Sequence, residues 1–136
     1  MAQYWLVKSE PDTYSFDDLV RDGSTVWDGV RNPAAAKHLR AMAVGDEVFF
    51  YHSGAKPGVV GLAKVTKTAF PDPNDASGRW VAVELAAGKP VKKPVSLADI
   101  KAEPALADLA IVRQGRLSVS PVTAAEWKTI TAMSQG

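Results

Sequence analysis

An aromatic ring, a cation and a helix start stand close together in the segment from Trp27 to Pro33. Asn32 followed by Pro33 is typical of a helix start, because Asn can accept from the unpaired amides and Pro loses no hydrogen bond at the first helical position. The amides and dipole at such a start favour an anion such as phosphate. Trp27 and Arg31 lie just upstream. A flat apolar ring beside an anion site suits a nucleotide.

A second aromatic wall is expected from residues 47–53, whose β-branched and aromatic content predicts a strand. Tyr51 is the natural partner for Trp27, and it shares a strand face with Ser53. Stacking contributes ~1–3 kcal/mol per base, so two such rings could hold a base that has left its stack.

The other three tryptophans differ in their settings. Trp5 and Trp127 lie in apolar periodic segments, which predicts core positions. Trp80 follows a polar loop, and both a core position and a ligand contact remain open for it.

Lys8, Ser9 and Glu10 follow an apolar strand-like segment. A lysine and a carboxylate at a strand end could transfer a proton if the lysine were desolvated, although both also suit a strand end in water. Ser9 could hydrogen-bond a ligand in either case. His52 and Ser53 do not form a hydrolytic pair, because neighbours in a regular strand project to opposite faces.

The composition excludes several kinds of site. The 136 residues contain no cysteine and two histidines, which excludes disulfides and Cys-ligated zinc. No H-x-x-H, Walker A or G-x-G-x-x-G pattern occurs. We therefore expect no metal and no cofactor.

The chain is predicted to be one domain, residues 1–136, without an internal repeat or linker. Its apolar runs are far shorter than the ~20 residues of a membrane helix, and no charged-then-apolar leader opens it. We expect a cytoplasmic monomer with no membrane partner. A net charge of +1 gives no overall attraction to a polyanion, so any nucleic-acid contact must come from local basic clusters, each of which could equally be a solvated face. The candidates are Arg31/Lys37/Arg40, Lys89-Pro-Val-Lys-Lys93 and Arg113-Gln-Gly-Arg116.

Short strands and capped helices alternate along the chain. Strands are expected at residues 4–8, 25–27, 47–53, 59–70, 79–85, 91–95 and 117–122. Helices are expected after the caps Ser15, Asn32, Ser96 and Thr123. The first strand is apolar on both faces and so central, and Gly61 indicates a bulge or a close backbone approach. Together they predict an α+β domain with a curled, barrel-like sheet and peripheral helices.

Several motifs in fixed order then identify a family resemblance. They are Trp5-Leu-Val-Lys-Ser-Glu-Pro11, Trp27-Asp-Gly-Val-Arg-Asn32, Leu39-Arg-Ala-Met42, Gly45-Asp46, Phe49-Phe-Tyr-His-Ser53, Val60-Gly61 and Arg116-Leu-Ser-Val-Ser-Pro-Val122. Over nearly the whole chain this resembles the EVE domain family. The resemblance implies a PUA-like fold, related to YTH readers of methylated adenine in RNA and to the ASCH domain. It also implies binding of a modified base, in DNA or RNA, from a flipped or single-stranded nucleotide.

The resemblance assigns roles to individual residues. Trp27 and Tyr51 would be pocket walls, and Ser9 and Ser53 would hydrogen-bond the base edge. Arg31, Asn32 and His52 would form part of the rim or contact a phosphate. Apart from the resemblance, Val30 and Trp80 are further candidate ligand contacts. The nucleic-acid backbone would meet Lys37, Arg113 and Arg116. If the acidic loop of residues 70–80 borders the path of the nucleic acid, the affinity for nucleic acid would be weaker here.

Two other functions stay open beside the binding module. ASCH relatives include amide hydrolases acting on modified nucleosides, with Lys8 here as base and Glu10 as its proton partner. A small-metabolite sensor, or a component of a toxin or restriction system, would suit the same pocket.

Overall fold

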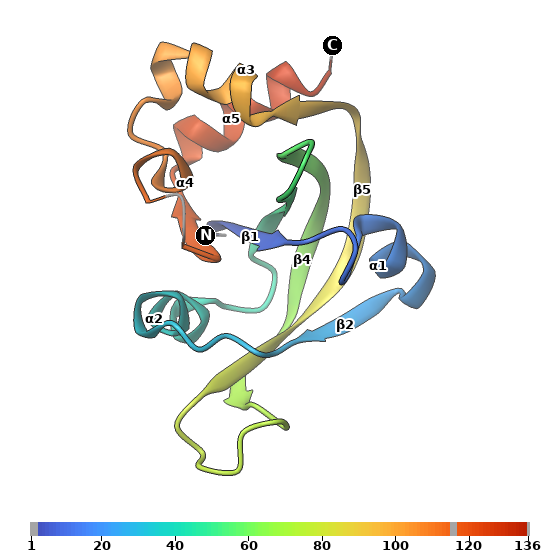
Figure 1. The fold of residues 1–136 in the computed structure, drawn as a ribbon, viewed down its shortest axis with the longest axis vertical. Coiled ribbons are helices and arrows are strands. Elements are labelled where there is room, and N and C mark those ends of the chain that lie inside the picture. The colour runs from blue at the N-terminus through green and yellow to red at the C-terminus, as the bar shows by residue number, and fades with distance from the viewer. Residues whose placement is uncertain (1–2, 115–116, 136) are drawn as a thin grey trace.

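One curled mixed sheet organises the chain in the computed structural model, which describes residues 3–114 and 117–135 (Figure 1). Its strands are β1 (Tyr4–Ser9), β2 (Ser24–Trp27), β3 (Glu47–His52), β4 (Gly58–Pro71), β5 (Val81–Ser96) and β6 (Val119–Val122). Their order is β2-β5-β4-β3-β1-β6, so β2 and β6 are edges and the sheet stays unclosed within those residues. The expected α+β fold with a curled sheet is confirmed, in its open rather than its barrel form.

The helices of the described residues are α1 (Phe16–Asp22), α2 (Pro33–Ala41), α3 (Leu97–Ala102), α4 (Ala110–Arg113) and α5 (Ala124–Met133), with a 3₁₀ turn at Pro104–Leu106. Four of these five begin where their caps predict, whereas α4 was not expected and has no side-chain cap. The side chains of Ser15, Asn32, Ser96 and Thr123 each accept from a backbone amide of the following first turn. No helix in the part of the chain described is long and apolar enough to cross a bilayer.

The strand predictions hold for the centre of the sheet. β1 pairs parallel with β3 and antiparallel with β6, and β4 is the antiparallel partner of β3. The register of β4 shifts on both sides of Gly61, where an added Cβ would lie 2.3 Å from a ring carbon of Phe16. Gly61 therefore marks both a bulge and a close approach.

Two strand predictions differ from the structure. The segments expected at 79–85 and 91–95 are one strand, β5, because irregular pairing with β4 carries the chain through Pro90 opposite Gly61. Pro121 lies inside β6 instead of closing it, which an edge strand tolerates.

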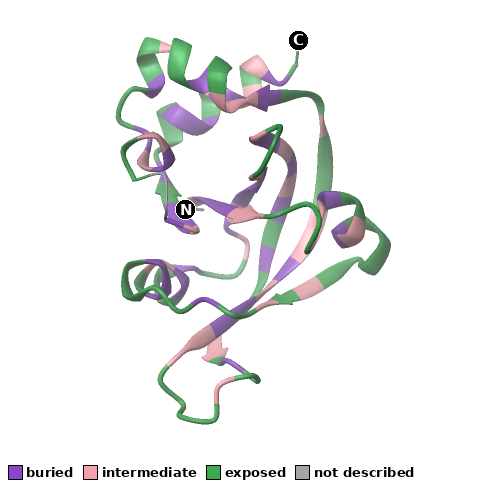
Figure 2. Ribbon diagram, in the orientation of Figure 1, coloured by how far each residue is buried: buried purple, intermediate pink, exposed green. Residues whose placement is uncertain are grey.

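Both faces of the sheet are buried. Neighbouring strand residues point to opposite sides, so the same strand contributes side chains to both faces. On one face Val7 and Phe50 pack against α1 and α2, and on the other Leu6 and Tyr51 pack beneath the layer of α3, α4 and α5. Figure 2 shows the buried residues concentrated along the central strands. Trp5 and Trp127 are 4% and 8% exposed, which confirms both as core residues. Each sheet face therefore has its own core.

Candidate functional site

A cavity of about 570 Å³ opens beside the end of β1. It lies between the residues that follow β1, the strand β2 and the loop into α2. The lining residues are Lys8, Ser9, Glu10, Thr13, Tyr14, Thr25, Val26, Trp27, Asp28, Gly29, Val30, Arg31, Asn32 and Ser118. The structure thus gathers most of the predicted ligand contacts around one hollow.

Trp27 forms an aromatic wall of this cavity, as predicted. The half-buried ring packs edge-on against Phe50 at 5.6 Å and against Tyr14 at 6.5 Å between ring centroids. These contacts fix the indole against the first core while part of it faces the cavity. A preset ring of this kind can accept a flat ligand without losing much side-chain entropy.

Tyr51 is not the opposite wall, so that prediction is wrong. Trp27 packs against Phe50, and the next residue along β3 must project to the other face of the sheet. Tyr51 accordingly lies in the second core, 2% exposed, and lines a separate cavity. Ser53 shares that second cavity, as expected from its shared strand face, and does not line the first.

Tyr14 is the second aromatic residue that lines the cavity, and it contacts the Trp27 ring edge-on instead of facing it across a gap. Its hydroxyl donates to Asp22 Oδ2 at 2.9 Å, and its backbone oxygen accepts from Ser9 Oγ at 2.7 Å. Burial raises the pKa of Tyr14, so it is a neutral donor at physiological pH. Nothing in the local sequence marks this residue, because its place depends on the turn that returns from β1 to α1.

His52 holds a helix start instead of a ligand. Its Nε2 accepts from the Phe16 amide at 3.0 Å, and it lines neither cavity. Burial lowers the pKa of His52, which keeps the ring neutral and able to accept. The predicted rim role is therefore wrong for this residue.

Arg31 lines the cavity and is anchored by a buried carboxylate. Its Nη1 lies 2.8 Å from Oδ2 of Asp72, whose side chain is fully buried while that of Arg31 is 40% exposed. Asp72 also accepts from the amides of Gly29 at 2.8 Å and Asn74 at 2.7 Å. Burial alone would raise the pKa of Asp72, but the bonds from Arg31 and these amides outweigh it and lower the pKa.

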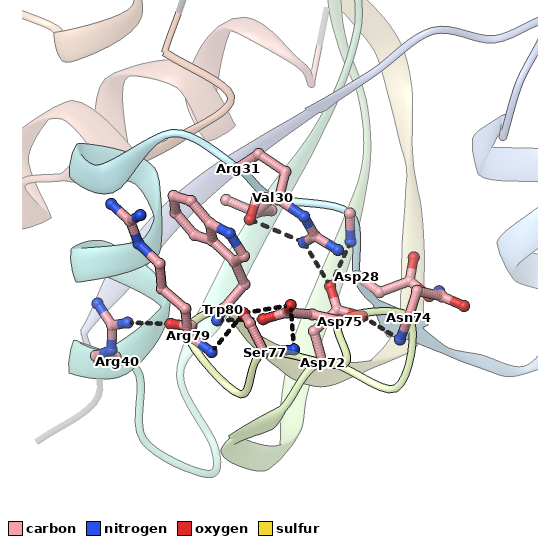
Figure 3. A network of polar contacts seen from close by, with 11 residues as sticks. Asp28, Val30, Arg31, Arg40, Asp72, Asn74, Asp75, Ser77, Arg79 and Trp80 are labelled. Carbon is pink, nitrogen blue, oxygen red and sulfur yellow. Dashed lines mark hydrogen bonds and ion pairs between the residues drawn. The ribbon is translucent and has the colours of Figure 1, made fainter.

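The acidic loop of residues 72–80 is thus a support for the cavity (Figure 3). Asn74 Nδ2 donates to Asp28 Oδ2 at 2.7 Å, a second link between this loop and the cavity lip. Asp75 binds Ser77 and the Trp80 amide inside the loop, and these bonds lower its pKa to about 2. Asp72 is buried and paired with Arg31, so it acts as a structural anchor of the cavity lip, and the expected effect of this acidic loop on nucleic-acid affinity stays a prediction.

Trp80 lies outside the cavity lining. Its half-buried ring packs against the first core, with the guanidinium carbons of Arg79 and Arg31 at 5.0 and 5.9 Å from the ring centroid. Figure 3 shows the ring between these two side chains, with Arg40 nearby donating to the Arg79 backbone oxygen. Arg79 is a cation that sequence reasoning missed.

The start of α2 offers less to an anion than predicted. Asn32 lines the cavity, but its Oδ1 accepts from the Ala35 amide at 3.1 Å and its backbone oxygen from the Ala36 amide. The Ala36 bond is the first regular helical bond, but the Asn32 side chain engages the Ala35 amide and Pro33 has no amide hydrogen, so few amides are left for an anion. Val30 lines the cavity beside them and is 6% exposed.

The predicted backbone contacts are spread over the surface. Lys37 is exposed on α2, and Arg113 is exposed and paired with Asp108 at 3.2 Å. Arg116 lies outside the described residues.

Lys8 and Glu10, the proton-transfer candidates, both line the first cavity. Within residues 3–114 and 117–135 no three His, Cys, Asp or Glu side chains gather as metal ligands.

Comparison with known proteins gives close relatives over the full length. Thymocyte nuclear protein 1 of Rattus norvegicus is 35% identical over 169 residues, covering 99% of this chain and 75% of that protein. An NMR structure from Rhodopseudomonas palustris is 50% identical with a TM-score of 0.93, covering 98% of this chain and 93% of that one. The crystal structure of the human THYN1 protein in complex with 5-methylcytosine-containing DNA is 30% identical with a TM-score of 0.93, and 99% of each chain is covered.

An ASCH protein from Zymomonas mobilis, at 12% identity, 96% and 98% coverage and a TM-score of 0.60, shares the fold alone. The family model for the EVE domain matches residues 3–133. The chain belongs to the EVE domain family.

Proposed function

We propose that this chain binds DNA carrying a modified base and that the base enters the cavity beside Trp27. The observation that carries the proposal is the geometry of that cavity, about 570 Å³ with a preset indole wall and polar groups around it. Its volume falls within the ~300–1,000 Å³ typical of small-ligand sites. The human relative crystallised with 5-methylcytosine DNA supports the choice of ligand.

The lining suits a base that has left its stack. A nucleobase has two apolar faces and a polar edge, and the cavity offers an aromatic wall beside donors and acceptors from Lys8, Glu10 and Asn32. A stacked base inside a duplex could not reach between these walls, so the ligand is a flipped or single-stranded nucleotide. An added methyl group that becomes buried contributes about 0.8 kcal/mol, which is roughly fourfold in affinity.

Cations beside the cavity supply the backbone contacts. Arg31 lines the cavity at its lip. Arg79 and Arg40 lie on the same side, where the Arg40 guanidinium donates to the Arg79 backbone oxygen (Figure 3). With a net charge of only +1, these few groups must carry the electrostatic attraction. The salt dependence should therefore be shallow, corresponding to about two or three phosphates. Since one chain builds the whole cavity, we propose that the monomer is the binding unit.

The test is a titration of matched oligonucleotides with and without 5-methylcytosine, single-stranded and duplex, followed by fluorescence polarisation. The wild-type protein should prefer the modified strand about fourfold. Trp27→Ala should abolish the preference and weaken binding by about 10-fold or more, because a stacking contact is lost. Equal affinity for both strands across a panel of base modifications, or Trp27→Ala binding like wild type, would overturn the proposal. The same panel in RNA shows which polymer is preferred.

A hydrolase is the second candidate, because Lys8 and Glu10 both line the cavity. Incubation with N-acylated nucleosides would then release the acyl group, and Lys8→Ala would stop the release. Absence of turnover in the wild-type protein would leave the binding module as the function.

A further inference from the structure

A second cavity, of about 230 Å³, lies on the opposite face of the sheet and has no role in base binding as described above. Its polar lining includes Lys8, Tyr51, Ser53 and Lys101, and its apolar lining includes Ile111 and Val112. It is smaller than the ~300–1,000 Å³ of sites that hold drug-sized ligands. Its size therefore suits a small group.

The Tyr51 hydroxyl has no hydrogen-bond partner among the described residues, although the residue is 98% buried (2% exposed). Ser120 Oγ is the sole fully enclosed side-chain polar atom without a partner in the same ranges. The Tyr51 hydroxyl must therefore reach the accessible space of the cavity. A hydroxyl in this position needs a partner from the cavity, because leaving it without one would cost about 1–3 kcal/mol. It is therefore available to an acceptor that enters the cavity.

The cavity offers donors and positive charge. Lys101 adds positive charge to the lining, Lys8 also lines the cavity, and none of the described residues that line it is acidic. Burial raises the pKa of Tyr51, so the phenol keeps its proton at neutral pH. Ser53 Oγ donates to the Ser9 backbone oxygen over a long 3.4 Å, which leaves it able to turn toward a better acceptor. Such a set matches a group that only accepts hydrogen bonds and carries negative charge.

Lys8 connects this cavity to the first one, since it lines both. In the register of the sheet Lys8 stands beside Tyr51, and Ser9 beside His52, so the end of β1 is the partition between the two hollows. The two cavities therefore share the end of β1 as a wall, so the second cavity lies beside a strand whose base fills the first one. We propose that the second cavity binds a phosphate group of the nucleotide strand whose modified base occupies the first cavity. This assignment rests on the proposed function.

The experiment compares a single-stranded oligonucleotide containing 5-methylcytosine with the 5-methyldeoxycytidine nucleoside, which has no phosphate. Tyr51→Phe should weaken the oligonucleotide on the order of 10-fold, because a hydrogen bond to a charged group is lost, and should leave nucleoside binding unchanged. Lys101→Ala should weaken the oligonucleotide and reduce the salt slope by about one. Lys128→Ala, an exposed lysine on α5, is the control and should change neither.

A purely structural role for Tyr51 is separated by thermal unfolding. Removing a hydroxyl that has no partner should leave the midpoint unchanged or raise it, even as oligonucleotide binding falls. A lower midpoint with unchanged oligonucleotide affinity would overturn the proposal.

Inorganic phosphate tests the cavity when no base binds. If the wild-type protein shows no preference for modified oligonucleotides, the proposed function fails, and phosphate is then titrated while the Ser53 and Gly54 amide signals are followed by NMR. Shifts that disappear in Tyr51→Phe would support the phosphate site and overturn its assignment to a nucleotide strand. Absence of shifts, together with equal oligonucleotide affinity of wild type and Tyr51→Phe, would overturn the site itself.

Discussion

Replacing Asp72 with alanine should both destabilise the fold and blunt recognition of the modified base, although this residue does not line the cavity. Its carboxylate accepts from the Gly29 amide at 2.8 Å and the Asn74 amide at 2.7 Å, and it pairs with Arg31 at 2.8 Å. The loop that holds Gly29 and Arg31 follows Trp27 directly and forms the cavity lip. Asp72→Ala therefore removes the anchor of this lip.

The magnitude follows from the three bonds. Each partly buried amide left without an acceptor costs about 1 kcal/mol. The ion pair contributes at most about 1 kcal/mol, because the Arg31 side chain is 40% exposed and can return to water. The sum of about 2–3 kcal/mol corresponds to a drop of about 6–10 °C in the unfolding midpoint for a chain of this size.

The assay combines thermal unfolding with the ratio of affinities for methylated and unmethylated strands. The midpoint should fall as stated, and at a temperature where the variant is folded the ratio should drop to about twofold or less, since loosening the lip removes part of the burial of the methyl group. Asp75→Ala is the matched control, because Asp75 binds amides within the same loop and none on the cavity lip. It should leave the affinity ratio unchanged.

An Asp72→Ala protein with the stability and the affinity ratio of wild type would refute this reasoning. The pH dependence offers an independent check. The pKa of Asp72 is lowered in the fold, so its stabilisation is present above the usual Asp pKa of about 4 and is lost as the pH falls through the lower folded value. The acid-induced loss of stability should therefore be smaller in Asp72→Ala.

Three further predictions concern the frame around the site. Gly61→Ala should lower stability by about 1–3 kcal/mol in denaturant titrations, because the new Cβ would overlap the Phe16 ring; an unchanged midpoint would contradict the close approach. The pKa of His52 is lowered, so its neutral form stabilises the fold above pH ~6.5, and this stabilisation is lost as the pH falls through the folded value. In His52→Gln the free energy of unfolding should therefore change less between pH 7 and pH 5. An unaltered pH dependence would argue against the bond from the Phe16 amide. Trp5→Phe should cost about 1–3 kcal/mol in the same titration, since Asp46 would lose the indole donor at 2.9 Å, and wild-type stability would show that this bond contributes nothing.

Local signals in the sequence predicted most of the elements. The four helix caps act within one turn, so Ser15, Asn32, Ser96 and Thr123 could be found from spacing alone. The central place of β1 followed from its apolar residues on both faces. The single strand β5 could not be found this way, because Gly88 and Pro90 normally break a strand and only the bulged pairing with β4 accommodates them.

The candidate site depends on contacts between residues far apart in the sequence, so fewer of its residues could be predicted. The position of Trp27 at the cavity could be predicted, because its neighbours already indicated a loop beside a helix start. Tyr51 was wrong because strand parity orders residues within β3 but does not say which face meets β2. Asp72 lies 43 residues from Gly29, and nothing short-range indicates that a loop acid folds back as a buried anchor.

A crystal structure of the protein with a short strand containing 5-methylcytosine tests the proposed base site most directly. We predict the modified base in the first cavity, against the Trp27 indole and beside Lys8, Glu10 and Asn32. A base bound elsewhere, for example on the Trp80 ring between Arg31 and Arg79, with the Trp27 cavity unoccupied, would contradict it.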